Sequence, residues 1–387
     1  MTPFSYRNPT RIHFGVGAIG QLPDVLRAAG IQHALLACDP GIIQAGLLER
    51  TTRILAAAQI PHSIFSDIQS DPDVRSVRAG AELARTQGCD GVIGLGGGSV
   101  MDVAKAIGTM LANPGDISDY FGVDQIPNRA APVVAIPTTA GTGSEVTVWS
   151  VLSDSEHNRK VNVGSEKNSA HTALLDPELS LRLPPAVTAA TGMDALTHAI
   201  ESLVNKACHP LAAAQAEKAI ELIGAHLRHA VLRGDDLQAR SQMLVGSTLA
   251  GLAFNRIRLG LAHAFALPLG NGFHISHGLV NAIMLTPVMQ YNVPANVAGY
   301  ARVARLLGED THGISERAAA ERAVAAVQGL KKDIGLTQTL ADFGVAEQHF
   351  DAVIKEAMTS GNIPVNPRTP NHEDMRLLLR QAMNGTV

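Results

Sequence analysis

Short apolar runs alternate with amphipathic stretches through the first half of the chain. Four of these runs are rich in aliphatic residues and have the length of buried strands: residues 34–39, 62–66, 90–96 and 133–137. Around them, apolar residues recur at helical spacing, which predicts helices over residues 21–29, 43–58, 74–88 and 100–112. A regular alternation of strands and helices predicts a parallel sheet covered by helices.

The pattern then changes twice. Three β-rich segments within residues 146–176 follow one another without long helices, which predicts an antiparallel appendage. Beyond the Pro184-Pro185 break, the spacing is helical almost throughout. We therefore predict an α/β domain over residues 1–183 and an all-α domain over residues 184–387.

Composition excludes several classes of protein. The 387 residues are 46% hydrophobic and 17% charged, with a net charge of −4 and no block of like charges. This argues against nucleic acid or a membrane surface as a partner. The three cysteines are scattered, and we find neither an apolar signal core nor a stretch that could span a bilayer. We expect a cytoplasmic protein without a disulfide framework.

Two glycine motifs compete for a dinucleotide. Gly15, Gly17 and Gly20 spell G-x-G-x-x-G, and Asp39 ends a predicted strand nineteen residues later. The preceding strand is short and partly polar, and a lone motif of this kind has low specificity, because glycines at such a position often only make a turn. The second motif, residues 96–99, joins a strongly apolar strand to a helix, which is the arrangement of a pyrophosphate cradle. A third loop, residues 137–145, is rich in hydroxyls and glycines and also follows a strand.

A set of polar residues in the second half predicts a metal site. Asp194 and His198 are four residues apart and share one face of a predicted helix, with Glu201 beside them. His263 and His277 stand on either side of a segment that contains glycine and proline and is predicted to turn. One carboxylate and three imidazoles suit Fe(II) or Zn(II).

Other interpretations of these residues stay open. Asp194 also fits an N-terminal helix cap behind Thr191. A helical histidine is more often a surface residue than a ligand, and His226 and His229, which have charged neighbours, are interpreted as solvated.

The motifs together resemble those of the iron-containing (group III) alcohol dehydrogenases, a family that includes lactaldehyde reductases and propanediol dehydrogenases. The matching segments are GGGSVMDVAKAIG, IPTTAGTGSEVT, LDPEL, TGMDALTHAIE, GLAHAFALPLG with the later HG, and NPR. The resemblance covers essentially the whole chain. It implies a Rossmann-like dinucleotide-binding α/β domain followed by an all-α domain, as in the dehydroquinate synthases.

The resemblance also assigns residues. It implies metal ligation by Asp194, His198, His263 and His277, and pyrophosphate contacts from Gly97, Gly98 and Ser99, with Asp102 on the following helix. It implies further coenzyme contacts from Asp39, Thr138, Thr139, Thr142 and Lys160, and a substrate pocket lined by Trp149, Phe254 and Leu259. Many members carry a second histidine where this chain has Leu267, which we place in the pocket. His274 is therefore the candidate for the proton route, and Lys160 is the second catalytic candidate.

The predicted activity is NAD- and metal-dependent oxidation of a small alcohol or diol, or reduction of an aldehyde. Fe(II) is expected, with Zn(II) as the alternative, and Asp39 favours NAD over NADP. The pocket candidates include no basic residue, which argues against an acidic substrate. Two alternatives remain: a dehydroquinate-synthase-like lyase that uses NAD transiently, and a non-catalytic nucleotide-binding protein. We expect a homo-oligomer, a dimer or larger.

Overall fold

The computed structural model describes residues 3–157 and 159–386. Within it the chain divides into two compact units. The α/β unit comprises residues 7–183, and the helical unit comprises residues 184–386 together with residues 3–6. The N-terminal segment joins the helical unit because the ring of Phe4 stacks on His209 at 4.2 Å, and Gln215 donates a hydrogen bond to the Tyr6 hydroxyl at 2.6 Å.

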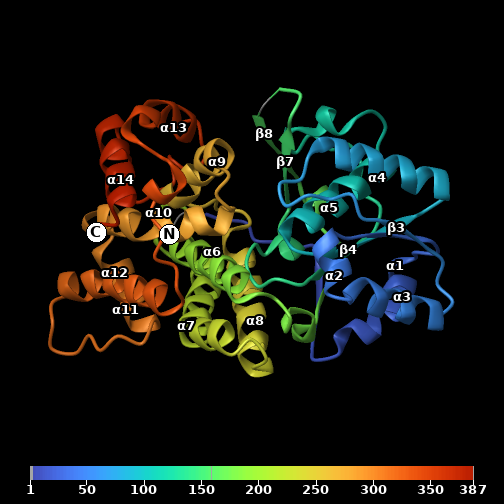
Figure 1. The fold of residues 1–387 in the computed structure, drawn as a ribbon, viewed down its shortest axis with the longest axis horizontal. Coiled ribbons are helices and arrows are strands. Elements are labelled where there is room, and N and C mark those ends of the chain that lie inside the picture. Colours follow the sequence, from blue (N-terminus) through green and yellow to red (C-terminus); the bar gives the residue numbers. More distant parts are fainter. Residues whose placement is uncertain (1–2, 158, 387) are drawn as a thin grey trace. The chain divides into compact units, whose positions relative to one another are not determined.

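A six-stranded parallel sheet forms the centre of the α/β unit, with the strand order β1-β9-β6-β4-β2-β3. Figure 1 labels two of these strands, β3 and β4. Its strands are β1 (Arg11–Phe14), β2 (Ala34–Ala37), β3 (His62–Phe65), β4 (Gly91–Gly96), β6 (Val133–Pro137) and β9 (Thr172–Leu175). All their pairings are parallel. The predicted parallel sheet is confirmed, and the apolar runs are continuous because both faces of the inner strands are buried.

Helices cover both faces of this sheet. They are α1 (Leu22–Ala29), α2 (Pro40–Gln44), α3 (Leu47–Ala57), α4 (Val74–Gln87) and α5 (Gly98–Ala112). Alternate residues of β2 enter different cores: Leu35 packs in the core that contains α4 and α5, and Leu36 packs in the one that contains α1 and α3. The single helix predicted over residues 43–58 is wrong, because the left-handed Gly46 (φ 74) separates α2 from α3.

The antiparallel appendage is smaller than predicted. β7 (Trp149–Asp154) and β8 (Arg159–Gly164) form an antiparallel hairpin, with the short β5 (Gly122–Val123) parallel to β8. The third predicted segment instead forms β9, which pairs with β1 and β6 inside the main sheet. Its side chains are buried throughout, as an inner strand requires.

The helical unit contains no strand among its described residues. Its helices are α6 (Pro185–Val204), α7 (Pro210–Leu232), α8 (Leu237–Phe254), α9 (Leu261–Phe273), α10 (His277–Asn292), α11 (Val297–Leu306), α12 (Glu316–Asp333), α13 (Phe350–Ala357) and α14 (His372–Asn384). The predicted all-α character is confirmed. Within the described part of the chain, no helix has the length and apolar character needed to cross a membrane.

Candidate active site

Helix α6 carries the first two predicted ligands inside the helical unit. It begins at Pro185, so Thr191 lies well within it, where its hydroxyl donates to the carbonyl of Val187 at 2.9 Å. The alternative interpretation of Asp194 as an N-terminal cap is therefore wrong. The face that Asp194 and His198 share is buried, since these residues are 2% and 4% exposed. The helix is buried because α7, α8 and α10 all pack against it.

Four side chains converge at this point. The Nε2 atoms of His263, His277 and His198 lie 3.6, 3.7 and 4.0 Å from Oδ1 of Asp194. One ligand atom from each residue lies within 4.8 Å of the other three. Three of the side chains are buried, and His277 is 48% exposed. One carboxylate oxygen and three imidazole nitrogens at these separations fit a divalent transition metal.

The segment between His263 and His277 is helical. α9 continues through Pro268, and only residues 274–276 separate it from α10. The predicted glycine- and proline-containing turn is therefore wrong. The helix tolerates its proline because its apolar side chains, such as Phe265, are fully buried.

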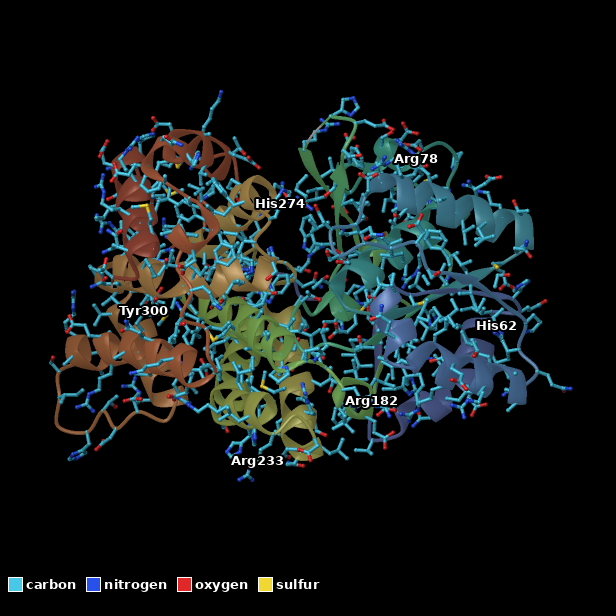
Figure 2. The ribbon with its side chains drawn as sticks, viewed as in Figure 1. His62, Arg78, Arg182, Arg233, His274 and Tyr300 are labelled. Carbon is cyan, nitrogen blue, oxygen red and sulfur yellow. The ribbon has the colours of Figure 1, made fainter. Side chains whose placement is uncertain are left out.

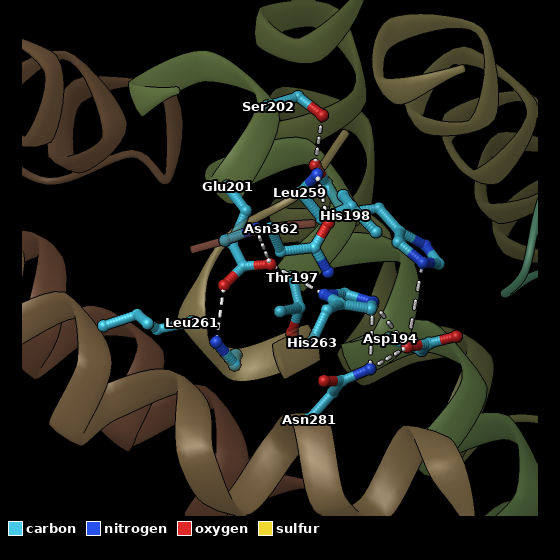
Figure 3. A network of polar contacts seen from close by, with 12 residues as sticks. Asp194, Thr197, His198, Glu201, Ser202, Leu259, Leu261, His263, Asn281 and Asn362 are labelled. Atoms are coloured by element: carbon cyan, nitrogen blue, oxygen red, sulfur yellow. Dashed lines mark hydrogen bonds and ion pairs between the residues drawn. The ribbon is translucent and has the colours of Figure 1, made fainter. Parts of the chain in front are cut away.

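A buried carboxylate orients one ligand. Oε2 of Glu201 lies 2.7 Å from Nδ1 of His263, and the Glu201 carboxylate also accepts hydrogen bonds from the backbone of Gly260 and Ala262 at 2.8 and 2.7 Å (Figure 3). A carboxylate at Nδ1 fixes the proton there and leaves Nε2 for a cation. A Cβ at Gly260 would come within 2.7 Å of Glu201, so this approach requires glycine.

The two carboxylates also set the charge of His263. Burial alone would lower the pKa of this imidazole, but the hydrogen bonds to Asp194 and Glu201 raise it to about 9. Burial would likewise raise the pKa of the Asp194 carboxyl, but His198, His277 and His263 hold it well below its usual range. A cation that binds here replaces a proton, because a ligating histidine must be neutral.

Close packing of two helices brings His277 beside Asp194. A Cβ at Gly278 would lie 2.5 Å from the carbonyl oxygen of Ala190 and 3.4 Å from the Cβ of Asp194. Only glycine allows α10 to approach α6 so closely. The His-Gly pair at 277–278 therefore serves both ligation and packing.

In the α/β unit, the second glycine motif lies at the carboxyl end of β4. Gly97 precedes the first residue of α5, whose first N–H groups have no acceptor within the helix. The loop that follows β6 lies against it: Thr138 donates its backbone N–H to Gly96 at 3.0 Å, and a Cβ at Gly98 would lie 2.6 Å from the Thr142 methyl. The two predicted ligand loops are thus adjacent at one sheet edge, where open α/β sheets bind ligands.

The first glycine motif is occupied by the protein itself. The backbone N–H groups of Gly17 and Ile19 each donate to the carboxylate of Asp176 at 3.1 Å. Asp176 is fully buried. An internal carboxylate therefore takes the place that a phosphate would need, which favours the second motif, at residues 96–99, for the coenzyme.

A buried ion pair holds the loop after β6. The ammonium of Lys105 lies 3.2 Å from Asp102 and donates to the backbone carbonyls of Ser144, at 2.9 Å, and Trp149. The Asp102 carboxylate also accepts from the Ser144 hydroxyl and from the backbone of Val151, both at hydrogen-bond distance. These contacts tie α5 to the loop, so Asp102 acts on the loop in addition to its predicted coenzyme role.

Lys160 and Ser99 have partners within the α/β unit. Lys160 lies on β8, where its ammonium contacts Asp71 and donates to the Ser153 hydroxyl at 2.6 Å. Burial lowers the pKa of Lys160 to about 8. The Ser99 hydroxyl donates to the carbonyl of Ser70 at 2.6 Å.

Asp39 stands at the carboxyl end of β2, the strand beside β4. Its side chain accepts the backbone N–H of Ile42 at 3.0 Å and caps α2. The residue thus has a structural role as well as the predicted one on the adenosine ribose.

The pocket candidates are divided between the units. Trp149 belongs to the α/β unit, where its ring covers Gly164 on the facing strand. The other three belong to the helical unit, and the ring of Phe254 stacks on His198 with centroids 4.5 Å apart. Leu259 is buried, and Leu267 on α9 is partly exposed.

His274 follows the last residue of α9 (Figure 2). It is exposed and left-handed, with φ 54, which is uncommon outside glycine, asparagine, aspartate and histidine. Among the described residues, no hydrogen bond or ion pair links it to the four ligands. The conformation supports a helix-ending role, and the proton route through His274 stays a prediction.

Sequence reasoning assigned no role to Asn281, Lys105 or Asp176, and it noted Glu201 only as a polar neighbour. Spacing could have identified two of them, because Glu201 lies three residues after His198 and Asn281 lies four after His277. Lys105 follows Asp102 by three residues in an otherwise apolar helix. The local sequence around Asp176 indicates only the cap that it forms on Glu178, because the Gly17 and Ile19 N–H groups that it also binds are more than 150 residues away.

An α/β unit with a strand-glycine-helix cradle and a helical unit with a buried carboxylate–histidine set are features of a nucleotide-dependent metalloenzyme. Residues 9–177 match "Iron-containing alcohol dehydrogenase", and residues 188–383 match "Fe-containing alcohol dehydrogenase family, C-terminal". A 1,3-propanediol dehydrogenase from Klebsiella pneumoniae is 40% identical over 98% of each chain. The chain belongs to the iron-containing alcohol dehydrogenase family.

Solved structures agree with this family assignment. The crystal structure of a 1,3-propanediol oxidoreductase has a TM-score of 0.96 and 40% identity, covering 98% of this chain and 100% of that one. Sulfoacetaldehyde reductase from Bifidobacterium kashiwanohense, solved with NAD+, has a TM-score of 0.90 and 30% identity over 99% of both chains. The protein is an oxidoreductase of alcohols or aldehydes that uses NAD and a metal. The lyase and the non-catalytic alternatives are not favoured.

Proposed function

We propose that the protein interconverts a small, uncharged alcohol or diol and its aldehyde with NAD, and that Asp194, His198, His263 and His277 hold Fe(II). The observation that carries this proposal is the convergence of the four ligand atoms within 4.8 Å, three of them on buried side chains. A divalent metal held by these residues would supply Lewis-acid chemistry toward the substrate hydroxyl, and bound NAD would supply hydride-transfer chemistry.

The protein's own residues prepare these groups. Glu201 keeps Nε2 of His263 available, and the buried surroundings strengthen the attraction of Asp194 for a cation. Gly97, Gly98 and Ser99 would bind the pyrophosphate at the first turn of α5, and Thr138, Thr139 and Thr142 the nicotinamide half, with Asp102, Lys160 and Asp39 completing the predicted contacts.

The substrate is proposed on the pocket residues and the relatives together. The candidates Trp149, Phe254, Leu259 and Leu267 are apolar or aromatic, which favours an uncharged molecule. A relative named 1,3-propanediol dehydrogenase makes short diols the first class to test. A cytoplasmic location, a homo-oligomeric assembly and the domain limits 1–183 and 184–387 remain part of the proposal.

The test removes ligands one at a time. We expect Asp194→Ala and His263→Ala to lose the metal and the NAD-dependent oxidation of 1,3-propanediol. His229→Ala, which removes an exposed histidine from α7, is the matched control and should keep both. Elemental analysis after anaerobic iron loading gives the metal content, and NADH absorbance gives the activity. Full metal occupancy in both ligand variants would overturn the assignment.

The parent protein also tests the choice of metal and of substrate. Metal-free protein is reconstituted with Fe(II) or with Zn(II), and kcat/KM is measured for a series of short alcohols, diols and aldehydes. Higher activity with Zn(II) would replace Fe(II) in the proposal, and preference for a charged substrate would contradict the proposed uncharged one.

A further inference from the structure

Asn281 lies one helical turn after His277 on α10 and is fully buried. Its amide nitrogen is 2.7 Å from Oδ1 of Asp194 and 3.0 Å from Nε2 of His263 (Figure 3). The same nitrogen is 3.2 Å from Nε2 of His277. It therefore contacts three of the four proposed ligand atoms. Its amide oxygen is buried and has no hydrogen-bond partner among the described residues.

Only one of these three contacts is compatible with a bound metal. The histidine Nε2 atoms have a single lone pair, which a cation takes when they ligate. The Asp194 oxygen has two lone pairs, so it can accept the Asn281 N–H and still face a cation. The hydrogen bond to Asp194 is also the shortest of the three.

An unpartnered buried oxygen disfavours the folded protein. A leucine of similar volume would avoid this penalty at position 281, so the amide is poorly explained by packing alone. The retained group is the N–H donor, and it points at the carboxylate that is the only anion among the four ligands.

We propose that Asn281 is a positioning residue of the metal centre, which holds Oδ1 of Asp194 toward the three imidazoles. Without it, the carboxylate can rotate about its side-chain torsions, and the metal loses a preorganised oxygen ligand. The inference rests on the proposed metal site and adds a residue that acts through Asp194.

The test measures metal binding directly. Metal-free protein is titrated with Co(II) against a competing chelator, and the visible absorption of the bound ion is recorded. We expect Asn281→Leu to bind Co(II) about 10–100-fold more weakly than the parent and with an altered spectrum. The matched control is Asn292→Leu on the same helix, which removes a buried amide paired with Asn366 and should leave affinity and spectrum unchanged.

The same substitution in a protein that already carries Asp194→Asn shows whether Asn281 acts through Asp194. In Asp194→Asn protein, the further change Asn281→Leu should weaken Co(II) binding less than it does in the parent, because the neutral amide that replaces the carboxylate is a weaker acceptor for the Asn281 N–H. If Asn281→Leu lowers Co(II) affinity by the same factor in the parent and in Asp194→Asn protein, the inference is overturned. Parent-like affinity and spectrum in Asn281→Leu, or an equal loss in Asn292→Leu, would also overturn it.

These outcomes are separable from failure of the metal site itself. If the parent and His263→Ala bind Co(II) equally well, the proposed ligand set is wrong, and the role of Asn281 falls with it. If His263→Ala loses the ion and Asn281→Leu retains it, the metal site stands and only the role of Asn281 fails.

Discussion

Two glycine loops in the α/β unit are similar in sequence and differ in what their backbone N–H groups face. The loop over residues 15–20 follows the edge strand β1, and two of its N–H groups bind the buried carboxylate of Asp176. The loop over residues 96–99 follows the inner strand β4 and leads into the first turn of α5, beside the loop after β6. A carboxylate thus occupies the first site permanently, and the second lies where a phosphate can bind.

The comparison shows that a glycine motif describes a backbone shape and leaves the bound anion undefined. Both loops turn sharply and expose N–H groups, which is why both fit a phosphate-binding pattern. The first satisfies those groups with a residue more than 150 positions away and so fastens β1 to the segment after β9. Four experiments separate the two roles.

The largest effect is expected at Gly98. Gly98→Val should weaken NAD binding by about 100-fold or more, because the new side chain crowds both the coenzyme phosphates and the Thr142 methyl, 2.6 Å from an added Cβ. Fluorescence titration with NAD measures the effect, and the melting temperature of the same variant shows how much of it is lost packing. NAD affinity close to that of the parent would move the coenzyme away from this loop.

A change at Asp176 should lower stability and leave NAD binding unchanged, the opposite of the change at Gly98. Asp176→Ala leaves the N–H group of Gly17 and the buried N–H group of Ile19 without an acceptor, and we expect the free energy of unfolding to fall by about 2–3 kcal/mol. The Kd for NAD should stay near that of the parent at a temperature where both are folded. Denaturant unfolding and NAD titration give the two values, and a selective loss of NAD affinity would show that the first loop contributes to the coenzyme site.

The preference for NAD over NADP tests the predicted role of Asp39, which follows β2, the strand beside β4. Removing the charge of Asp39 should improve kcat/KM for NADP relative to NAD about tenfold, because a carboxylate repels a 2′-phosphate. Asp39→Asn is the suitable change, since asparagine keeps the cap on α2 that the Asp39 carboxylate provides. An unchanged preference in this variant, with Asp39→Gly as the uncapped comparison, would place the ribose elsewhere.

The separation in sequence between interacting residues decides how much of the fold and of the site could be predicted. The buried strands and the Asp194–His198 pair are local patterns, so periodicity and spacing located them. The edge placement of β1, the transfer of β9 into the main sheet and the Asp176 contact depend on segments distant in the chain, and no local pattern records them. The burial of α6 depends on distant segments in the same way, because α7, α8 and α10 pack against it although its own sequence has a polar side.

The smallest effect compares two glycines within the first loop. Gly17 is left-handed, with φ 75, and an alanine there should cost about 1 kcal/mol of folding free energy through backbone strain. Gly20 lies in the following 3-10 helix without a positive φ, and an added Cβ there meets no atom within 4 Å. Gly20→Ala should therefore leave stability unchanged or raise it slightly by restricting the unfolded chain.

Neither variant should alter NAD affinity, because the N–H groups of this loop already bind Asp176. Urea unfolding of both variants measures the difference in stability, and NAD titration checks the second expectation. Equal stability of the two would mean that the turn relaxes without its left-handed residue, whereas weaker NAD binding by Gly17→Ala alone would return the coenzyme to the loop that Asp176 fills.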